Sequence, residues 1–157
     1  MRTCRFLRFP GWRRLAIVAA AAFVVVRFLL TPSVVVGESM EPTYSRRGLN
    51  AIARWRFWFR EPRRGEVVVL RWRGRATLLK RVLAFEGETV EFRDGVCYVD
   101  GAPLDEPWVV LRGGWNLPPR TVAPGRIYVM GDNRSMDPDA HVGGEIARSR
   151  LLGGPLL

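Results

Sequence analysis

The first thirty residues combine an uninterrupted apolar run with positive charge on one side. Residues 15–26 contain no polar side chain and the apolar run resumes after Arg27, whereas residues 1–14 hold five arginines. This pattern predicts a transmembrane helix over residues 15–30, with residues 1–14 as a basic cytoplasmic N-terminus. Such a helix spans about 24 Å of a hydrocarbon core of about 30 Å, so Trp12 must share the crossing. A cleavable secretory signal sequence is the competing interpretation.

Beyond residue 30 the hydrophobic pattern changes to short strands and turns, and no sustained helical periodicity follows. Asp94-Gly95 and Asp100-Gly101 are typical hairpin turns, and residues 112–124, rich in Gly and Pro, are predicted to be loop. The predicted strands are residues 67–70, 78–84, 90–93, 96–99 and 127–130. The predicted fold class is therefore an all-β domain over residues 31–157, preceded by one transmembrane helix.

Residues 54–60, which read RWRFWFR, alternate cationic and aromatic side chains. One interpretation is an amphipathic strand that buries its aromatic face in the domain. The other is a contact with a membrane surface, where Trp and Arg side chains are both favourable. The sequence leaves both interpretations open.

The net charge of +10 and the pI of 11.2 favour an anionic partner, either a nucleic acid or an anionic membrane surface. The arginines follow no helix-turn-helix, zinc-finger or RNP pattern, so we expect no nucleic-acid partner and favour the lipid bilayer. Cys4 and Cys97 supply neither a metal cluster nor a disulfide framework. We therefore predict neither a metal nor a cofactor.

Lys80 is the one lysine among 25 basic residues and lies in an apolar strand. Arginine stays protonated at ordinary pH, whereas a buried lysine can lose its proton and act as a base. Ser39 lies in a turn that follows three valines, where a serine can be an exposed nucleophile. Ser-Lys pairs are a known variant of nucleophile activation. His141, in a polar, glycine-rich segment, is the other candidate base.

Four separated segments, in this order and spacing, match the sequence boxes of a known family. They are residues 37–43 (GESMEPT), 64–70 (RGEVVVL), 80–84 with 87–88 (KRVLA and GE) and 128–134 (YVMGDNR). With the preceding apolar run, they make the chain similar to the type I signal peptidases. The resemblance implies a membrane-anchored serine endopeptidase with a signal-peptidase-like β fold. Its partners would be signal-peptide-bearing preproteins, and its catalytic domain would lie on the extracytoplasmic side of the cell membrane.

The resemblance also implies roles for individual residues. Ser39 is the nucleophile, Lys80 is the general base, and the Ser39 main-chain N–H contributes to the oxyanion hole. Gly37 occupies a position from which some members offer a hydroxyl, so another donor must complete the hole here. The supporting residues implied by the boxes are Met40, Pro42, Arg81, Gly131, Asp132, Asn133, Arg134, Asp137 and Asp139.

The chain departs from the family pattern in three places. Glu66 stands where Asp is usual, and the interval between Lys80 and Gly131 is too short for the large inserted domain of some members. The resemblance is therefore to the minimal, Gram-positive-like form. An ungapped alignment puts Asp137 where a serine often hydrogen-bonds the lysine, and a carboxylate there would favour the charged amine. An alternative alignment with a two-residue deletion puts Ser135 at that position.

Three alternatives share parts of this evidence. A specialised family member that processes a pilin-like or conjugative-transfer substrate would carry the same motifs. Self-cleaving repressors use the same Ser-Lys chemistry on a similar β fold, but they need a DNA-binding domain where this chain has an apolar run. A non-catalytic membrane relative is disfavoured because Ser39 and Lys80 are both present.

Overall fold

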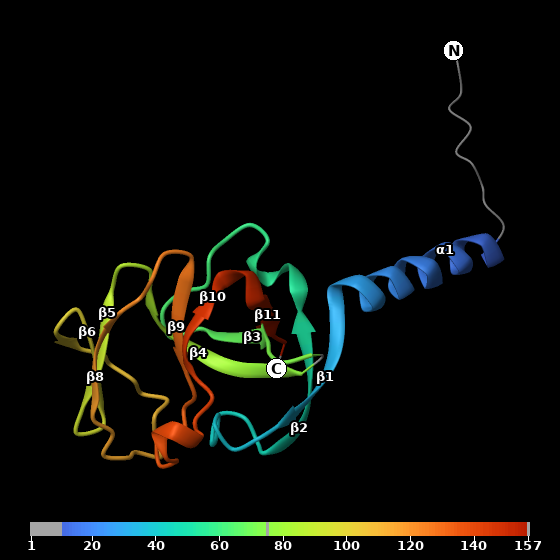
Figure 1. Cartoon of the computed structure of the whole chain (residues 1–157). Helices are drawn as coiled ribbons and strands as arrows, with labels where there is room; N and C mark the ends of the chain where they lie inside the picture. The colour runs from blue at the N-terminus through green and yellow to red at the C-terminus, as the bar shows by residue number, and fades with distance from the viewer. Residues whose placement is uncertain (1–10, 75, 157) are drawn as a thin grey trace.

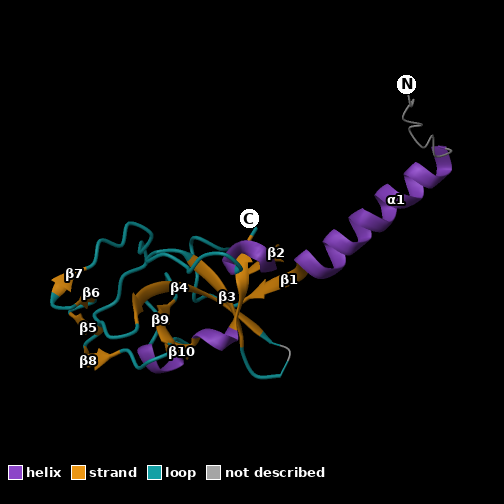
Figure 2. Ribbon diagram, turned by 90° about the horizontal axis from the view of Figure 1, so that it is seen from above, coloured by secondary structure: helices purple, strands orange, loops and turns teal. Residues whose placement is uncertain are grey.

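The structure, a computed structural model, describes residues 11–74 and 76–156. Its first element is the helix α1 (Gly11–Val24), and a short π-helix, η1 (Val25–Leu29), connects it to the strand β1 (Leu30–Val36). In Figures 1 and 2, α1 projects away from the strands, and none of its residues is buried. The helix therefore makes no core with the rest of the described chain.

The helical segment lies nearer to the N-terminus than the sequence predicts. We expected a helix over residues 15–30, but α1 begins at Gly11 and Leu30 already belongs to β1. Pro32 gives a reason for this early end, because a proline restricts the residue before it to extended backbone. Within the described residues, no helix combines the length and the apolar character that crossing a membrane requires. Residues 1–10 of the predicted basic N-terminus lie outside the described residues.

The rest of the chain is mostly β, as the hydrophobic pattern predicts. The further strands are β2 (Arg47–Ala53), β3 (Val67–Arg71), β4 (Thr77–Phe85), β5 (Thr89–Arg93), β6 (Val96–Val99), β7 (Ala102–Pro103), β8 (Leu117–Thr121), β9 (Arg126–Met130), β10 (Gly144–Ala147) and β11 (Leu151–Pro155). Three short 3₁₀ helices accompany them: η2 (Arg54–Phe57), η3 (Pro138–Ala140) and η4 (Arg148–Arg150). The strands form a seven-stranded sheet in the order β1-β2-β11-β3-β4-β9-β10 and a four-stranded sheet in the order β7-β6-β5-β8.

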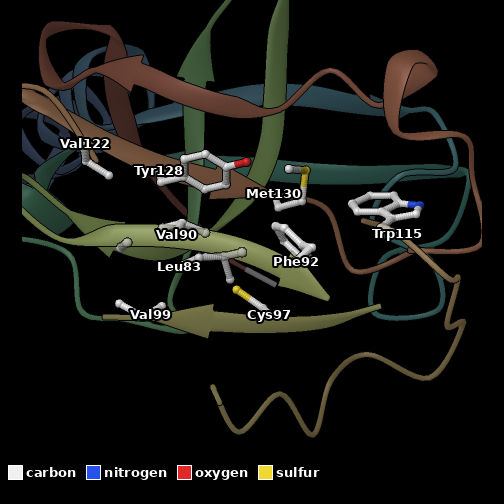
Figure 3. Packing of buried hydrophobic residues seen from close by; sticks show 10 residues of the cluster. Leu83, Val90, Phe92, Cys97, Val99, Trp115, Val122, Tyr128 and Met130 are labelled. Carbon is white, nitrogen blue, oxygen red and sulfur yellow. The ribbon is translucent and has the colours of Figure 1, made fainter. Parts of the chain in front are cut away.

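The four-stranded sheet is an excursion of the chain between β4 and β9, and it lies at the end of the molecule opposite α1 (Figure 1). Its hairpins turn at Asp94-Gly95 and Asp100-Gly101, where all four residues have positive φ, as two-residue type I′ turns require. A cluster of buried side chains joins it to β4 and β9 (Figure 3). In this cluster Phe92 meets Trp115 edge-to-face, with ring centroids 5.6 Å apart.

One sequence prediction about local structure is wrong, and one of the two interpretations of residues 54–60 is excluded. Residues 112–124 are not all loop, because β8 lies within them; its two prolines fit an edge strand, where one backbone edge needs no partner. Residues 54–60 are not a strand with a buried aromatic face. They begin with η2, and Trp58 and Phe59 are 59% and 95% exposed.

β4 is the strand on which both the core and the site depend. It pairs with β3 along residues 77–81 and with β9 along residues 81–85. Six consecutive residues from Leu79 to Ala84 are buried or nearly so, with apolar clusters on both faces. A charged side chain on this strand is therefore withdrawn from water.

Candidate active site

Ser39 lies in the turn that follows β1. The turn is closed by a hydrogen bond from the Tyr44 amide to the Met40 carbonyl (2.9 Å), and the Met40 side chain is anchored in the core. The peptide bond before Pro42 is cis, and Gly37 has a φ of 127°, a value that favours glycine. Met40, Pro42 and Gly37 thus shape the turn, while Ser39 itself remains partly exposed.

Lys80 reaches this turn from β4. Its Nζ lies 2.8 Å from the Ser39 Oγ, although the two residues are 41 positions apart in the chain. Register with β3 places Lys80 opposite Val68, and its side chain is 1% exposed. The two residues that composition and turn chemistry single out are therefore in hydrogen-bond contact.

Burial determines the protonation of Lys80. Loss of hydration lowers its pKa from 10.5 to about 8, because a buried ammonium is disfavoured. The carboxylate of Asp132 acts in the opposite direction, and the charge of Arg134 adds to the lowering. An appreciable fraction of Lys80 is thus neutral near physiological pH, and a neutral amine can accept the serine proton.

The segment Gly131-Asp132-Asn133-Arg134 packs against the turn that contains Ser39 and is hydrogen-bonded to it. The Asn133 amide donates to the Ser39 carbonyl (3.0 Å), and the Asn133 Nδ2 donates to the Glu38 carbonyl (3.1 Å). A Cβ on Gly131 would lie 2.0 Å from the Ser39 carbonyl oxygen, so only glycine fits there. These contacts fix the main chain on both sides of the serine Cα.

Two buried ion pairs support this segment. Arg81 binds Asp132 through Nε and Nη2, at 2.8 and 2.5 Å, and Thr43 donates to the same carboxylate at 2.6 Å. Arg134, 1% exposed, pairs with Glu106 at 2.5 Å. Thr43 belongs to the turn that contains Ser39, and Arg81 follows Lys80 in β4. Asp132, which binds both, therefore connects the serine turn to β4.

Asp137 does not take the position beside the lysine that the alignment suggested. It is exposed and accepts a hydrogen bond from the Asp139 amide (2.8 Å), which caps η3. Within the described residues, the carboxylate that raises the pKa of Lys80 is that of Asp132. Asp139 is also exposed. The structure therefore does not bring these two predicted supporting residues to the dyad.

His141 is buried, contrary to what its polar surroundings in the sequence indicated. Burial, followed by the charges of Lys80 and Arg134, lowers its pKa to about 3. Its Nε2 contacts the Asn133 carbonyl oxygen at 3.2 Å. The nitrogen in contact with the Ser39 Oγ is that of Lys80, so the geometry favours Lys80 as the base.

Sequence reasoning missed the roles of Thr43, Glu106 and Trp108, and it considered His141 only as a candidate base. Trp108 stacks over the Arg81 guanidinium, 4.5 Å from its ring centroid, and its ring also leaves no space for a side chain at Gly65. Trp108 and Glu106 lie in a connection without regular structure, which carries no periodic signal. Thr43 lies within the motif of residues 37–43, but nothing near it in the sequence indicates that it contacts Asp132.

The two strands that carry the site are incompletely paired. Within the described residues, β1 pairs with β2 alone, and residues 78–80 of β4 pair with β3 alone. A cleft of about 390 Å³ is lined by Thr31 of β1, Thr77 of β4 and residues of other elements, including Ile52 and Leu152. Strand edges that are open on one side can accept an extended peptide by β-augmentation.

Known proteins are similar to this chain over most of its length. Residues 11–155 match the family described as signal peptidase, peptidase S26. A probable signal peptidase I-1 of Synechocystis sp. is 32% identical over 152 residues, which cover 90% of this chain and 78% of the relative. A signal peptidase I of Bacillus amyloliquefaciens is 31% identical over 162 residues, covering 90% and 80%.

Among solved structures, a signal peptidase I of Enterococcus faecalis has a TM-score of 0.49 at 24% identity, covering 60% of this chain and 97% of that chain. The family match and the sequence identities extend over nearly the whole chain. On that evidence, the chain belongs to the signal peptidase family, peptidase S26.

Proposed function

We propose that this chain is a membrane-bound serine endopeptidase that removes N-terminal signal peptides from exported preproteins with a Ser39-Lys80 dyad. The observation that carries the proposal is the 2.8 Å contact between the Lys80 Nζ and the Ser39 Oγ, made by an amine with a pKa of about 8. The names of the relatives, signal peptidase I in each case, support the substrate class.

The reaction follows from the proton positions. Neutral Lys80 accepts the hydroxyl proton as the Ser39 Oγ attacks the scissile carbonyl carbon, and the Ser39 main-chain N–H stabilises the developing oxyanion. The resulting Lys80 ammonium protonates the leaving amine, which releases the mature protein and leaves an acyl-enzyme. Lys80, neutral again, then accepts a proton from the water that hydrolyses the ester. Gly37 offers no side-chain donor, so solvent or main chain completes the oxyanion hole.

The signal peptide would bind as an extended strand between β1 and residues 78–80 of β4. Both edges end at the dyad, because Ser39 follows β1 and Lys80 is the last of the β4 residues that pair with β3 alone. Main-chain hydrogen bonds would set the register, while shallow apolar pockets would admit small side chains one and three positions before the cut. The pocket preference comes from the family resemblance.

Attachment to the membrane is part of this proposal. Residues 1–14 would form the cytoplasmic N-terminus, residues 15–30 the anchor, and residues 31–157 the extracytoplasmic domain. The exposed apolar side chains of α1 support it, since they have no contact with the folded domain to bury them. Residues 54–60 would add a second lipid contact, because Trp58 and Phe59 are exposed and η2 lies against η1.

Cys97 cannot report this topology as a labelling site. It is buried, and burial raises the pKa of its thiol to about 12, so it would be unreactive on either side of the membrane. A cysteine placed at the exposed Ser149 is the better probe. In intact cells it should react with an impermeant maleimide added from outside. Reaction only after lysis would contradict the proposed orientation.

The central experiment is incubation of the detergent-solubilised enzyme with a labelled secretory precursor, followed by N-terminal sequencing of the product. We expect one cut after the signal peptide, and none with Ser39→Ala, which removes the nucleophile and little else. Cleavage by Ser39→Ala at the wild-type rate would refute the proposed mechanism. A second substrate, a pilin-like precursor, separates the general peptidase from a specialised member. Nothing in the comparisons favours the repressor-like alternative, whose DNA-binding domain would have to occupy the place of α1.

A further inference from the structure

His141 is a buried titratable residue that the proposed mechanism does not use. It is 6% exposed, and its ring packs edge-to-face on Trp115 with centroids 5.1 Å apart. The other side of the ring covers Gly131, where an added Cβ would lie 2.5 Å from the His141 Cε1. The same Cβ would collide with the Ser39 carbonyl oxygen. Ser39, Gly131 and His141 are therefore stacked in direct succession.

A hydrogen-bond path runs parallel to this stack. The His141 Nε2 lies 3.2 Å from the Asn133 carbonyl oxygen, which can only accept, so Nε2 carries the ring proton. The Asn133 amide in turn donates to the Ser39 carbonyl at 3.0 Å. The remaining ring nitrogen, Nδ1, is buried and has no hydrogen-bond partner within the described residues. One imidazole N–H thus acts on the serine main chain through a single intervening residue.

The charges around the ring require it to stay neutral. Lys80 on β4 and Arg134 both face it, while Glu106 neutralises Arg134 and Asp132 acts on Lys80. A second cation inside this group would be repelled by the ammonium of Lys80. Burial and these charges lower the pKa of His141 to about 3, so the imidazole is neutral at every pH at which Lys80 can act as a base.

We propose that His141 is a positioning residue for the nucleophile: its neutral ring fixes the Asn133 carbonyl and fills the space under Gly131. It thereby holds the Ser39 turn at hydrogen-bond distance from Lys80. This inference rests on the proposed function and adds to it, because nothing in the family resemblance gives this histidine a role. The competing possibility is that His141 only contributes to the stability of the core.

Two substitutions at this position separate the possibilities. His141→Leu fills much of the ring's volume but has no N–H, whereas His141→Gln keeps a neutral donor that can reach the Asn133 carbonyl. We expect His141→Leu to lower kcat at least tenfold with little change in KM, since small displacements of a nucleophile are costly. His141→Gln should recover most of that loss. Rates are measured on a secretory precursor below the unfolding midpoint of each variant.

The matched control is Val90→Ala, which creates a cavity at a buried position of β5 in the cluster that also contains Trp115. It should lower the unfolding midpoint and leave kcat unchanged. If His141→Leu lowers kcat no more than Val90→Ala does, His141 is merely structural and the inference fails. Equal losses for His141→Leu and His141→Gln would also overturn it, because the donor would then be irrelevant.

The rate at which an organophosphorus reagent phosphonylates the Ser39 Oγ, with loss of the leaving group on phosphorus, is the second readout, because it requires no signal peptide. Slower labelling in His141→Leu than in Val90→Ala supports the inference even if no precursor is cleaved, in which case the proposed substrate class alone has failed. Labelling at the wild-type rate in His141→Leu overturns the inference, whatever the precursor assay shows.

Discussion

Two segments of this chain interleave cationic and apolar side chains, and they fold in opposite ways. In β4 the pair Lys80 and Arg81 is buried, at 1% and 8% exposure. In residues 54–60 the arginines lie at the surface, and so do Trp58 and Phe59, with Phe59 95% exposed, whereas Phe57 packs partly buried against a core cluster. The local pattern alone does not decide which outcome occurs.

The difference lies in the partners that the rest of the chain supplies. Arg81 forms a two-point ion pair with the fully buried Asp132, 51 residues away. Burial lowers the pKa of Lys80, so that its amine can be buried in the neutral form. In residues 54–60, Arg56 and Arg60 both bind Glu66, and Arg56 also donates to the Pro155 carbonyl at 2.7 Å. These arginines hold the pKa of Glu66 near 2, with the Arg60 hydrogen bond as the largest cause. The buried carboxylate of Asp132 allows β4 to carry its arginine into the core. Glu66 instead binds the arginines of residues 54–60 at the surface.

The largest effect should come from Lys80→Arg. This change preserves the positive charge and the approximate length, but a guanidinium does not deprotonate at ordinary pH. We expect no detectable processing of a secretory precursor, with the folded, membrane-bound protein present at wild-type levels. Processing at a comparable rate would show that β4 buries a cation without using it as a base.

A paired stability measurement tests the comparison itself. Arg81→Gln leaves Asp132 buried without its ion-pair partner, which costs about 3–5 kcal/mol for pairs of this kind. Arg60→Gln removes an arginine from the exposed cluster on Glu66, where ion pairs contribute little. Urea denaturation of both variants should show a large decrease in the free energy of unfolding for Arg81→Gln and a much smaller one for Arg60→Gln. Equal decreases would refute the distinction between the two segments.

The pH dependence of processing should reflect the burial of Lys80. The base must be neutral to accept the serine proton, and below its pKa of about 8 it is increasingly protonated. The rate on a fixed precursor should therefore fall about tenfold for each pH unit below that value and level off above it. If the processing rate instead rose around pH 6.5, the ordinary pKa range of histidine, Lys80 would not be the base.

Much of the fold could be predicted from the sequence, because its signals are local. The hairpins at Asp94-Gly95 and Asp100-Gly101 and the apolar runs of β3 and β9 follow turn chemistry and period. β11, which reads LLGGP, and β8, with two prolines, carry no such signal and are strands because neighbouring strands pair with them. The predicted helix bounds were wrong at both ends: α1 begins at Gly11, before the apolar run, and Leu30 is already the first residue of β1, next to the Thr31 backbone that Pro32 restricts to extended conformations.

For the site, the sequence nominated Ser39 and Lys80, and the structure brings them into contact. Their supports were less predictable, because they depend on distances across the fold. Asp137 seemed to oppose the lysine in the alignment, yet it caps η3 at the surface, and Asp132 takes that electrostatic role. His141 lies in a polar, glycine-rich segment of the sequence, which gave no sign of burial, whereas in the structure it packs on Trp115, 26 positions earlier.

The smallest effect should come from the exposed aromatic residues, and it is the one that tests their proposed contact with lipid. Trp58→Ser combined with Phe59→Ser removes two exposed rings that lie against no core cluster. Since neither ring is buried, the free energy of unfolding and the cleavage of a short soluble peptide should not change. If the rings enter an anionic bilayer, cleavage of a membrane-inserted precursor should fall several-fold in reconstituted vesicles, because aromatic residues favour the interface. The matched control is Val110→Ser, an exposed apolar position between β7 and β8 that should leave both rates unchanged. Equal rates of precursor cleavage for the double variant and the wild type would mean that the exposed rings of residues 54–60 face water and not lipid. Residues 54–60 would then differ from β4 only in that their side chains are not buried.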